Sequence, residues 1–284
     1  MTLDPEHLLD WSIADAHQSY DERDCILYAL GLGFGDDPLD PHHLRHVYEQ
    51  NLEPFPSLAL VLAAGSRWAS DPATGIDYSR VVHAEQSFTL ARPLPTRATV
   101  RSQSRVTEVV DKGAGRGAIV TSERALFFGD DEGPAALLSS SLFCRGDGGF
   151  GGPPSPSPKR PALPEGQPDA RVTMAIPPNL ALLYRLSGDM NPLHADPTVA
   201  LAAGFRAPIL HGLSSFGLAL RAAIGGLDLS PSALTGAGVR FTGPVYPGET
   251  IETDIWRLGG RLAFRSRIPA RDAPVLDYGW ISYD

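Results

Sequence analysis

The segment LSGDMNPLH, residues 186–194, combines a carboxylic acid with an imidazole inside an otherwise apolar stretch. Asp189 and His194 stand five residues apart and form a candidate acid/base pair. Burial among apolar side chains raises the pKa of a carboxyl group, and a neighbouring imidazole couples to its titration. Such a pair can hold a water molecule, remove a proton from it and give a proton back. Asn191 cannot titrate but can orient the pair or the water, and Pro192 restricts the loop.

A second candidate lies in PILHGLSSFG, where Gly212 stands at the expected start of a helix. Glycine lets a ligand approach the backbone closely, and the N–H groups at a helix N-terminus favour developing negative charge. The segment therefore predicts an oxyanion site for a thioester or a carboxylate. Eighteen residues separate His194 from Gly212, and a short helix is expected between them, so the chain could return to the same pocket.

Each of these candidates has a structural alternative. The pattern S-G-D-x-N-P is strong turn chemistry, so Asp189 could serve only as a cap. His194 could be an ordinary hydrogen-bonded histidine, and His211 could cap a helix or pack. Asp189, His194, Asp196 and His211 are also residue types that bind metals. However, no HxH, HxxxH or CxxC pair supports this set of four, and Asp196 is expected to be an N-cap, so we expect no metal.

A segment rich in Gly, Pro and Ser, residues 149–164, divides the chain. Proline removes backbone donors and glycine adds conformational freedom, so this segment is predicted to be a linker. It separates a first half, residues 1–148, from a second half, residues 165–284. We expect a hydrophobic core in each half because the apolar content, 43%, is that of globular proteins.

The two halves have related landmarks. Both contain LY-x-L followed by a glycine; Tyr28 and Phe88 are 60 residues apart, and Tyr184 and Phe241 are 57 apart. This repetition suggests a duplication, with chance similarity of short apolar pieces as the alternative. Only the second half has a histidine at the position of His194, so its loop is the one expected to carry the chemistry.

The second half has an α+β pattern. Residues 171–176 are predicted to form a strand. Residues 197–203 are predicted to form a short helix, with Asp196 as its N-cap, and residues 211–226 a long helix ended by two glycines. Four strand candidates follow, and the first half has the same order. We therefore expect in each half a long central helix wrapped by a curled antiparallel sheet.

The composition excludes some classes of protein. The formal net charge of -9 argues against broad electrostatic binding of nucleic acid. Cys25 and Cys144 are too few for a disulfide scaffold and are expected to be free thiols. No apolar run reaches the roughly 18 residues that a membrane span requires, and the N-terminal segment lacks the apolar region of a signal peptide. We expect a cytoplasmic protein.

The sequence YRLSGDMNPLHADP, followed by AGFRAPILHGLSSFG, resembles the signature of the MaoC-like, (R)-specific 2-enoyl-CoA hydratases, or hydratase 2. The resemblance runs over nearly the whole chain and is to the two-domain form. It implies a double hotdog fold and the reversible hydration of a trans-2-enoyl-CoA to a (3R)-3-hydroxyacyl-CoA. It also implies that no cofactor is needed, because CoA is part of the substrate.

The resemblance gives roles to single residues. Asp189 and His194 match the catalytic pair that activates water, Asn191 matches a supporting residue, and Gly212 matches the glycine whose N–H holds the thioester oxygen. Glu49 matches a functional glutamate of the first half, with Glu22 as a rival.

Other positions are candidates for binding substrate. Arg206 and His211 flank APIL in the segment that leads to Gly212. The chain departs from the family at residues 55–60, FPSLAL in place of Leu-Pro-Thr-Phe, and at Met190, where tryptophan is common. Both departures concern the acyl tunnel and its mouth, so they leave the preferred acyl chain open.

The resemblance also implies that the first hotdog is non-catalytic and accommodates the acyl tail. An exposed sheet edge makes a homodimer plausible. Two alternatives remain: a related hydro-lyase for a branched, steroid or dicarboxylic acyl-CoA, and a non-catalytic subunit that binds acyl-CoA.

Overall fold

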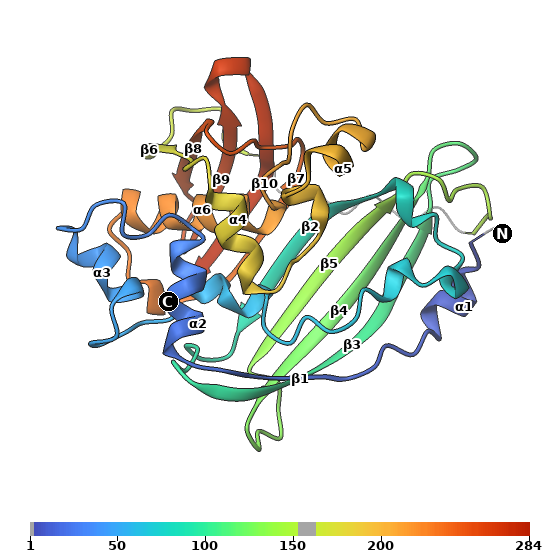
Figure 1. Ribbon diagram of the computed structural model, residues 1–284, viewed down its shortest axis with the longest axis horizontal. Helices are drawn as coiled ribbons and strands as arrows, with labels where there is room; N and C mark the ends of the chain where they lie inside the picture. The colour runs from blue at the N-terminus through green and yellow to red at the C-terminus, as the bar shows by residue number, and fades with distance from the viewer. Residues whose placement is uncertain (1–2, 153–162) are drawn as a thin grey trace.

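Ten antiparallel strands form one continuous sheet in the computed structural model, which describes residues 3–152 and 163–284 (Figure 1). The strand order is β1-β3-β4-β5-β2-β7-β10-β9-β8-β6, so each half contributes five neighbouring strands. The first half supplies β1 (Ala16–Tyr20), β2 (Val81–Leu90), β3 (Ala98–Asp111), β4 (Ala118–Phe128) and β5 (Ala136–Cys144). The second supplies β6 (Ala170–Ala175), β7 (Leu234–Phe241), β8 (Thr250–Arg257), β9 (Arg261–Ile268) and β10 (Ala273–Tyr283).

The helices are short, except for one. They are α1 (Pro5–Leu9), α2 (Glu22–Leu30), α3 (Pro41–Val47), α4 (Leu180–Tyr184), α5 (Pro197–Ala202) and α6 (Gly212–Gly226). Three of the single 3-10 turns matter for the site: η1 (Pro56–Leu60), η5 (Arg185–Ser187) and η6 (Pro192–His194). In the part of the chain that is described, none of the helices has the length and apolar character needed to cross a bilayer.

Helix α6 is the centre of the second half. Eleven of its 15 residues are buried, because the sheet covers its apolar face. The ring of Phe216 lies 6.2 Å from Phe88 on β2 and 6.3 Å from Phe264 on β9. The helix predicted over residues 211–226 is therefore confirmed, and it packs against strands from both halves.

Strands β2 and β7 join the two halves edge to edge. Their register runs from Glu85 opposite Arg240 to Thr89 opposite Gly236. Glycine is needed on β7 because a Cβ at Gly238 would lie 2.9 Å from the Cβ of Ser87. The hydrogen bonds of this seam make one sheet out of two five-stranded units.

The repeated tyrosine landmarks meet where the halves join. Helices α2 and α4 lie next to each other (Figure 1), and the rings of Tyr28 and Tyr184 are 5.8 Å apart. Both side chains are fully buried. The resemblance between these segments therefore corresponds to two similar helices packed together in one core.

The first half differs from the prediction of a long central helix in each unit. Its longest helix among the described residues is α2, with nine residues, and α2 packs beside α4. The chain after η1 cannot continue as a helix, because Ala63 and Gly65 have left-handed φ values of 43° and 71°. An irregular segment therefore takes the place of a helix against this part of the sheet, and Ser102 on β3 donates a hydrogen bond of 2.7 Å to the carbonyl of Ala63.

The predicted linker, residues 149–164, contains positions 153–162, which lie outside the described residues. Strand β5 ends at Cys144 before it, and β6 begins at Ala170 after it. The division into residues 1–148 and 165–284 stays a prediction.

Candidate active site

The loop between α4 and α5 is folded by its own polar side chains. The carboxylate Oδ1 of Asp189 accepts a hydrogen bond from the N–H of Asn191 at 3.2 Å. The amide Oδ1 of Asn191 accepts one from the N–H of Leu193 at 3.1 Å and so caps η6. These are Asx turns, and they use only one oxygen of Asp189. Asn191 therefore positions the loop, and the carboxylate keeps a second oxygen for a ligand.

The side chain of His194 is buried and has a fixed tautomer. Its Nδ1–H donates to the carbonyl of Ile209 at 2.8 Å, because a carbonyl can only accept. The other ring nitrogen, Nε2, is then unprotonated in the neutral ring and can accept a proton. Burial lowers the pKa of His194 from its ordinary value, so the ring is neutral at neutral pH.

His211 packs against His194 and supports the loop. Its ring stacks on His194 with the centroids 3.7 Å apart, and its Nε2–H donates to the backbone carbonyl of Asp189 at 3.1 Å. Burial, followed by the neighbouring His194, lowers the pKa of His211 to about 4. His211 precedes α6 but makes no side-chain cap, so packing and loop support are its structural roles.

The three side chains converge. A carboxylate oxygen of Asp189 and one ring nitrogen from each of His194 and His211 lie within 4.8 Å of one another. Three of the four residues with metal-binding chemistry therefore meet, whereas Asp196 caps α5 by accepting from the N–H of Thr198 at 2.8 Å. The two imidazole planes are only 25° from parallel, so their in-plane lone pairs do not converge well on one ion. The arrangement favours acid/base chemistry.

Gly212 begins α6 immediately after His211, so the helix start returns to the loop as expected. The first N–H groups of a helix have no partner within the helix and can face a ligand. A Cβ at Gly212 would lie 3.2 Å from the ring of Phe241, so a side chain here would press on that ring. The close packing therefore favours glycine at this position.

Two residues of the site were missed by sequence reasoning because they come from the first half. Burial lowers the pKa of His83 on β2 to about 4, and the charge of Asp189 opposes this shift. The pKa of Arg67 is raised by its hydrogen bond to Tyr78 and also by the charge of Asp189. Asp189 itself is exposed, so the expectation that its carboxylate is buried was wrong.

The other predicted substrate contacts lie farther out. Glu49 is exposed in the turn after α3, and Met190 is 55% exposed beside Asp189. Arg206 is 67% exposed and donates to Glu249 at 3.1 Å, and it lies over the ring of Tyr246. Within the described ranges, no hydrogen bond or ion pair joins Glu49 or Arg206 to the acid/base pair.

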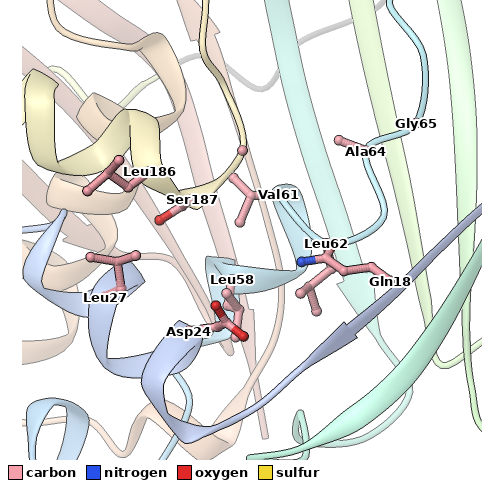
Figure 2. Close-up of a pocket in the computed structure, with 11 residues that line it drawn as sticks. Gln18, Asp24, Leu27, Leu58, Val61, Leu62, Ala64, Gly65, Leu186 and Ser187 are labelled. Atoms are coloured by element: carbon pink, nitrogen blue, oxygen red, sulfur yellow. The ribbon is translucent and has the colours of Figure 1, made fainter.

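A cavity of about 290 Å³ borders the loop on the side of the first half (Figure 2). Its size is near the lower limit of small-molecule sites, about 300 Å³. Gly188, which precedes Asp189, belongs to its wall. Figure 2 shows Leu27 on α2 facing Leu186 and Ser187 of the loop. The apolar part of the wall consists of Leu27, Leu58, Val61, Leu62 and Leu186.

The buried histidines predict acid lability. Burial lowers the pKa of His46, His83 and His211 to about 4 and lowers that of His194. Between about pH 6.5 and 4 the unfolded chain therefore binds more protons than the folded one. The free energy of unfolding consequently decreases as the pH is lowered. We expect the free energy of unfolding to drop by roughly 1–2 kcal/mol for each of His46, His83 and His211 from about pH 7 to 5. Urea denaturation at pH 7 and pH 5 measures this decrease, and an unchanged urea midpoint between the two would contradict it. The control is His42→Gln, at an exposed position, which should leave the pH dependence of the midpoint as it is in wild type.

Comparisons with known proteins agree with the division of the sheet. Residues 18–146 match the family model of the MFE-2 hydratase 2 N-terminal domain, and residues 159–273 match that of the MaoC like domain. The enoyl-CoA hydratase ChsH3 of Mycobacterium tuberculosis is 38% identical over 97% of both chains. Longer relatives named peroxisomal multifunctional enzyme type 2, from Drosophila melanogaster and Mus musculus, align over 46% and 36% of their own lengths.

Solved structures show the same architecture. A MaoC-like dehydratase from Phytophthora capsici superimposes with a TM-score of 0.85 at 32% identity and covers 98% of both chains. A Mycobacterium tuberculosis protein described as a double hotdog fold covers 95% of both chains with a TM-score of 0.54. At 14% identity this second likeness concerns the fold alone. The fold is a double hotdog.

Proposed function

Because the chain belongs to the family that joins a hydratase 2 N-terminal domain to a MaoC-like domain, we propose that it hydrates trans-2-enoyl-CoA to (3R)-3-hydroxyacyl-CoA, reversibly. The observation that carries the proposal is the convergence of Asp189 and His194 next to the start of α6. Relatives named enoyl-CoA hydratase support the same activity. A non-catalytic subunit would have no need for this set of residues.

The mechanism follows from the free atoms of the site. A water molecule is held between the carboxylate of Asp189 and the Nε2 of His194. The pair removes a proton as the water oxygen bonds to C3 of the enoyl group, and the electron pair of the double bond moves toward the thioester. The N–H of Gly212 stabilises the resulting enolate oxygen. Return of a proton to C2 completes the addition, and the reverse sequence eliminates water.

The proposal is tested with the purified full chain and crotonyl-CoA. Loss of the conjugated thioester absorbance measures hydration, and a (3R)-specific dehydrogenase reports the configuration of the product. We expect turnover with the (3R) product. Absence of turnover with both crotonyl-CoA and a long-chain trans-2-enoyl-CoA would overturn the hydratase proposal, whereas a (3S) product would overturn the assigned geometry.

Arg206 is proposed to contact the CoA phosphates, because its exposed guanidinium stands in the segment that leads to Gly212. We expect Arg206→Gln to raise the KM for crotonyl-CoA by about 3–10-fold with little change in kcat, as expected for a lost exposed charge contact. The KM for crotonyl-pantetheine, which lacks the nucleotide, should not change. Arg105→Gln, another exposed arginine in an ion pair, is the matched control. Equal effects on both substrates would contradict the assignment.

We also propose that the reaction needs no metal or redox cofactor, since the acid/base pair and the helix start supply all the groups used. Dialysis against a strong chelator is therefore expected to leave kcat/KM unchanged. Loss of activity that returns with added zinc would contradict this and would point to the cluster of Asp189, His194 and His211.

We propose that the protein forms a homodimer. We also propose that it is located in the cytoplasm. Strands β1 and β6 are the end strands of the sheet in the described part of the chain, and their edges are the candidates for pairing with a second copy. Several relatives are named as peroxisomal enzymes, so the peroxisome is the alternative location to be tested. Sedimentation of the purified chain and fractionation of cells measure the two properties; a monomer, or recovery in an organelle fraction, would contradict them.

A further inference from the structure

Two polar side chains stand in the wall of the cavity beside the loop that carries Asp189. They are Gln18, on edge strand β1, and Asp24, in the first turn of α2. Figure 2 shows both on the side of the first half, across from Leu186 and Ser187. A substrate whose reacting carbons lie at Asp189 would pass Gly188 and extend its tail into this cavity.

Within residues 3–152 and 163–284, the side-chain NH2 group of Gln18 has no hydrogen-bond partner. Its Oε1 accepts from the N–H of Ala63 at 2.7 Å, which fixes the side chain against the irregular segment of the first half. The NH2 group then remains for a partner in the cavity. An acceptor on a ligand tail could bond to it in place of solvent.

Asp24 brings a negative charge to the same wall. One oxygen, Oδ2, accepts from the N–H of Asp21 at 3.0 Å in the capping box of α2. In the described part of the chain no ion pair joins Asp24 to a cation, whereas Glu22 pairs with Arg97 at 2.9 Å. Burial raises the pKa of the Cys25 thiol to about 12, and the charge of Asp24 is the next largest cause, so this charge acts within the protein.

We propose that Asp24 makes the enzyme select acyl tails without a terminal carboxylate, and that Asp24 and Gln18 together bind a tail hydroxyl. A carboxylate in this small cavity would face a like charge at short range, which is a repulsive means of selection. A hydroxyl offers a donor to Asp24 and an acceptor to Gln18. The inference rests on the proposed function, and it disfavours dicarboxylic acyl-CoAs among the specialised substrates.

The test uses trans-2-enoyl-CoAs of increasing length that end in a methyl, hydroxyl or carboxylate group. For wild type we expect kcat/KM with carboxylate ends to be at least about tenfold below that with methyl ends once the tail reaches Asp24. Hydroxyl ends should be used at least as well as methyl ends. In Asp24→Asn the difference in kcat/KM between methyl-ended and carboxylate-ended substrates should narrow to about threefold, because the charge of Asp24 is lost.

Asp24→Asn keeps an oxygen for the N–H of Asp21 and nearly the same volume, so α2 should stay folded. Asp21→Asn is the matched control, because it removes a charge from the same helix end but lies outside the cavity wall. Crotonyl-CoA is too short to reach Asp24 and should be hydrated equally by all three proteins.

The outcomes separate the two proposals. If crotonyl-CoA and the methyl-ended substrates are not hydrated, the proposed function fails. If they are hydrated but carboxylate ends are used as well as methyl ends, the selection by Asp24 is refuted. It is also refuted if Asp21→Asn relieves the difference as much as Asp24→Asn does. A lower kcat/KM with hydroxyl-ended than with methyl-ended substrates would refute the proposed binding of a tail hydroxyl by Asp24 and Gln18.

Discussion

Replacing Asp189 by Asn is expected to lower kcat by about 10²–10⁴-fold, the usual range for the loss of a positioned acid/base group. Asparagine cannot exchange a proton with water in this way. It keeps an oxygen that can accept from the N–H of Asn191, so the turn that shapes the loop should survive. Steady-state kinetics with crotonyl-CoA and a thermal melt of the same protein measure the two effects.

Asp196→Asn is the control for this substitution. It removes the same charge seven residues later, at the N-cap of α5, where asparagine is as good a cap as aspartate. We expect near wild-type turnover from it. If Asp189→Asn also kept turnover within about threefold of wild type, proton transfer by Asp189 would be excluded as a main contribution.

Substitution of His194 is expected to be similarly severe, about 10²–10⁴-fold in kcat. The structure allows the two ring nitrogens to be tested separately. In His194→Asn the amide N–H can replace Nδ1–H and keep the hydrogen bond to Ile209, but nothing replaces Nε2. In His194→Gln the amide lies nearer the position of Nε2 but cannot act as a base.

Both His194 variants should therefore be nearly inactive, and His194→Asn should be the more stable of the two. Unfolding by urea, measured beside kcat, separates the anchoring role from the chemical one. Substantial activity in His194→Asn would show that Nε2 does not take the proton, and the water would then have to be activated by Asp189 alone.

The parts of the structure that depend on neighbouring residues were predicted well. Asp196 and Pro197 start a helix, and Gly204, with a φ of 86°, follows its end, so the prediction of residues 197–203 is close to α5. The start of α6 at Gly212 lies one residue from the predicted one. Caps, proline and glycine act within one turn of the chain, and their effects can be read from the sequence.

The parts that depend on distant residues were not predicted. Arg67 and His83 approach Asp189 from the first half, and no spacing in the sequence connects them. The first half was expected to have the same order of helix and strands as the second, but periodicity does not say whether a helix lies inside a sheet or beside α4. Apolar neighbours in sequence did not bury Asp189: the loop exposes residues 188–190, and Gly188 within it has a φ of 123°.

The seam between β2 and β7 has a consequence for how activity depends on dilution. In a pair of separate hotdog chains such a seam would form by association, and its occupancy would fall with protein concentration. Here both strands belong to one chain, so the seam forms at an effective concentration set by the connection between the halves. The residues of the first half that face Asp189 stay in place even where a homodimer has dissociated. Turnover per molecule should therefore be constant over the whole range of enzyme concentration used in an assay.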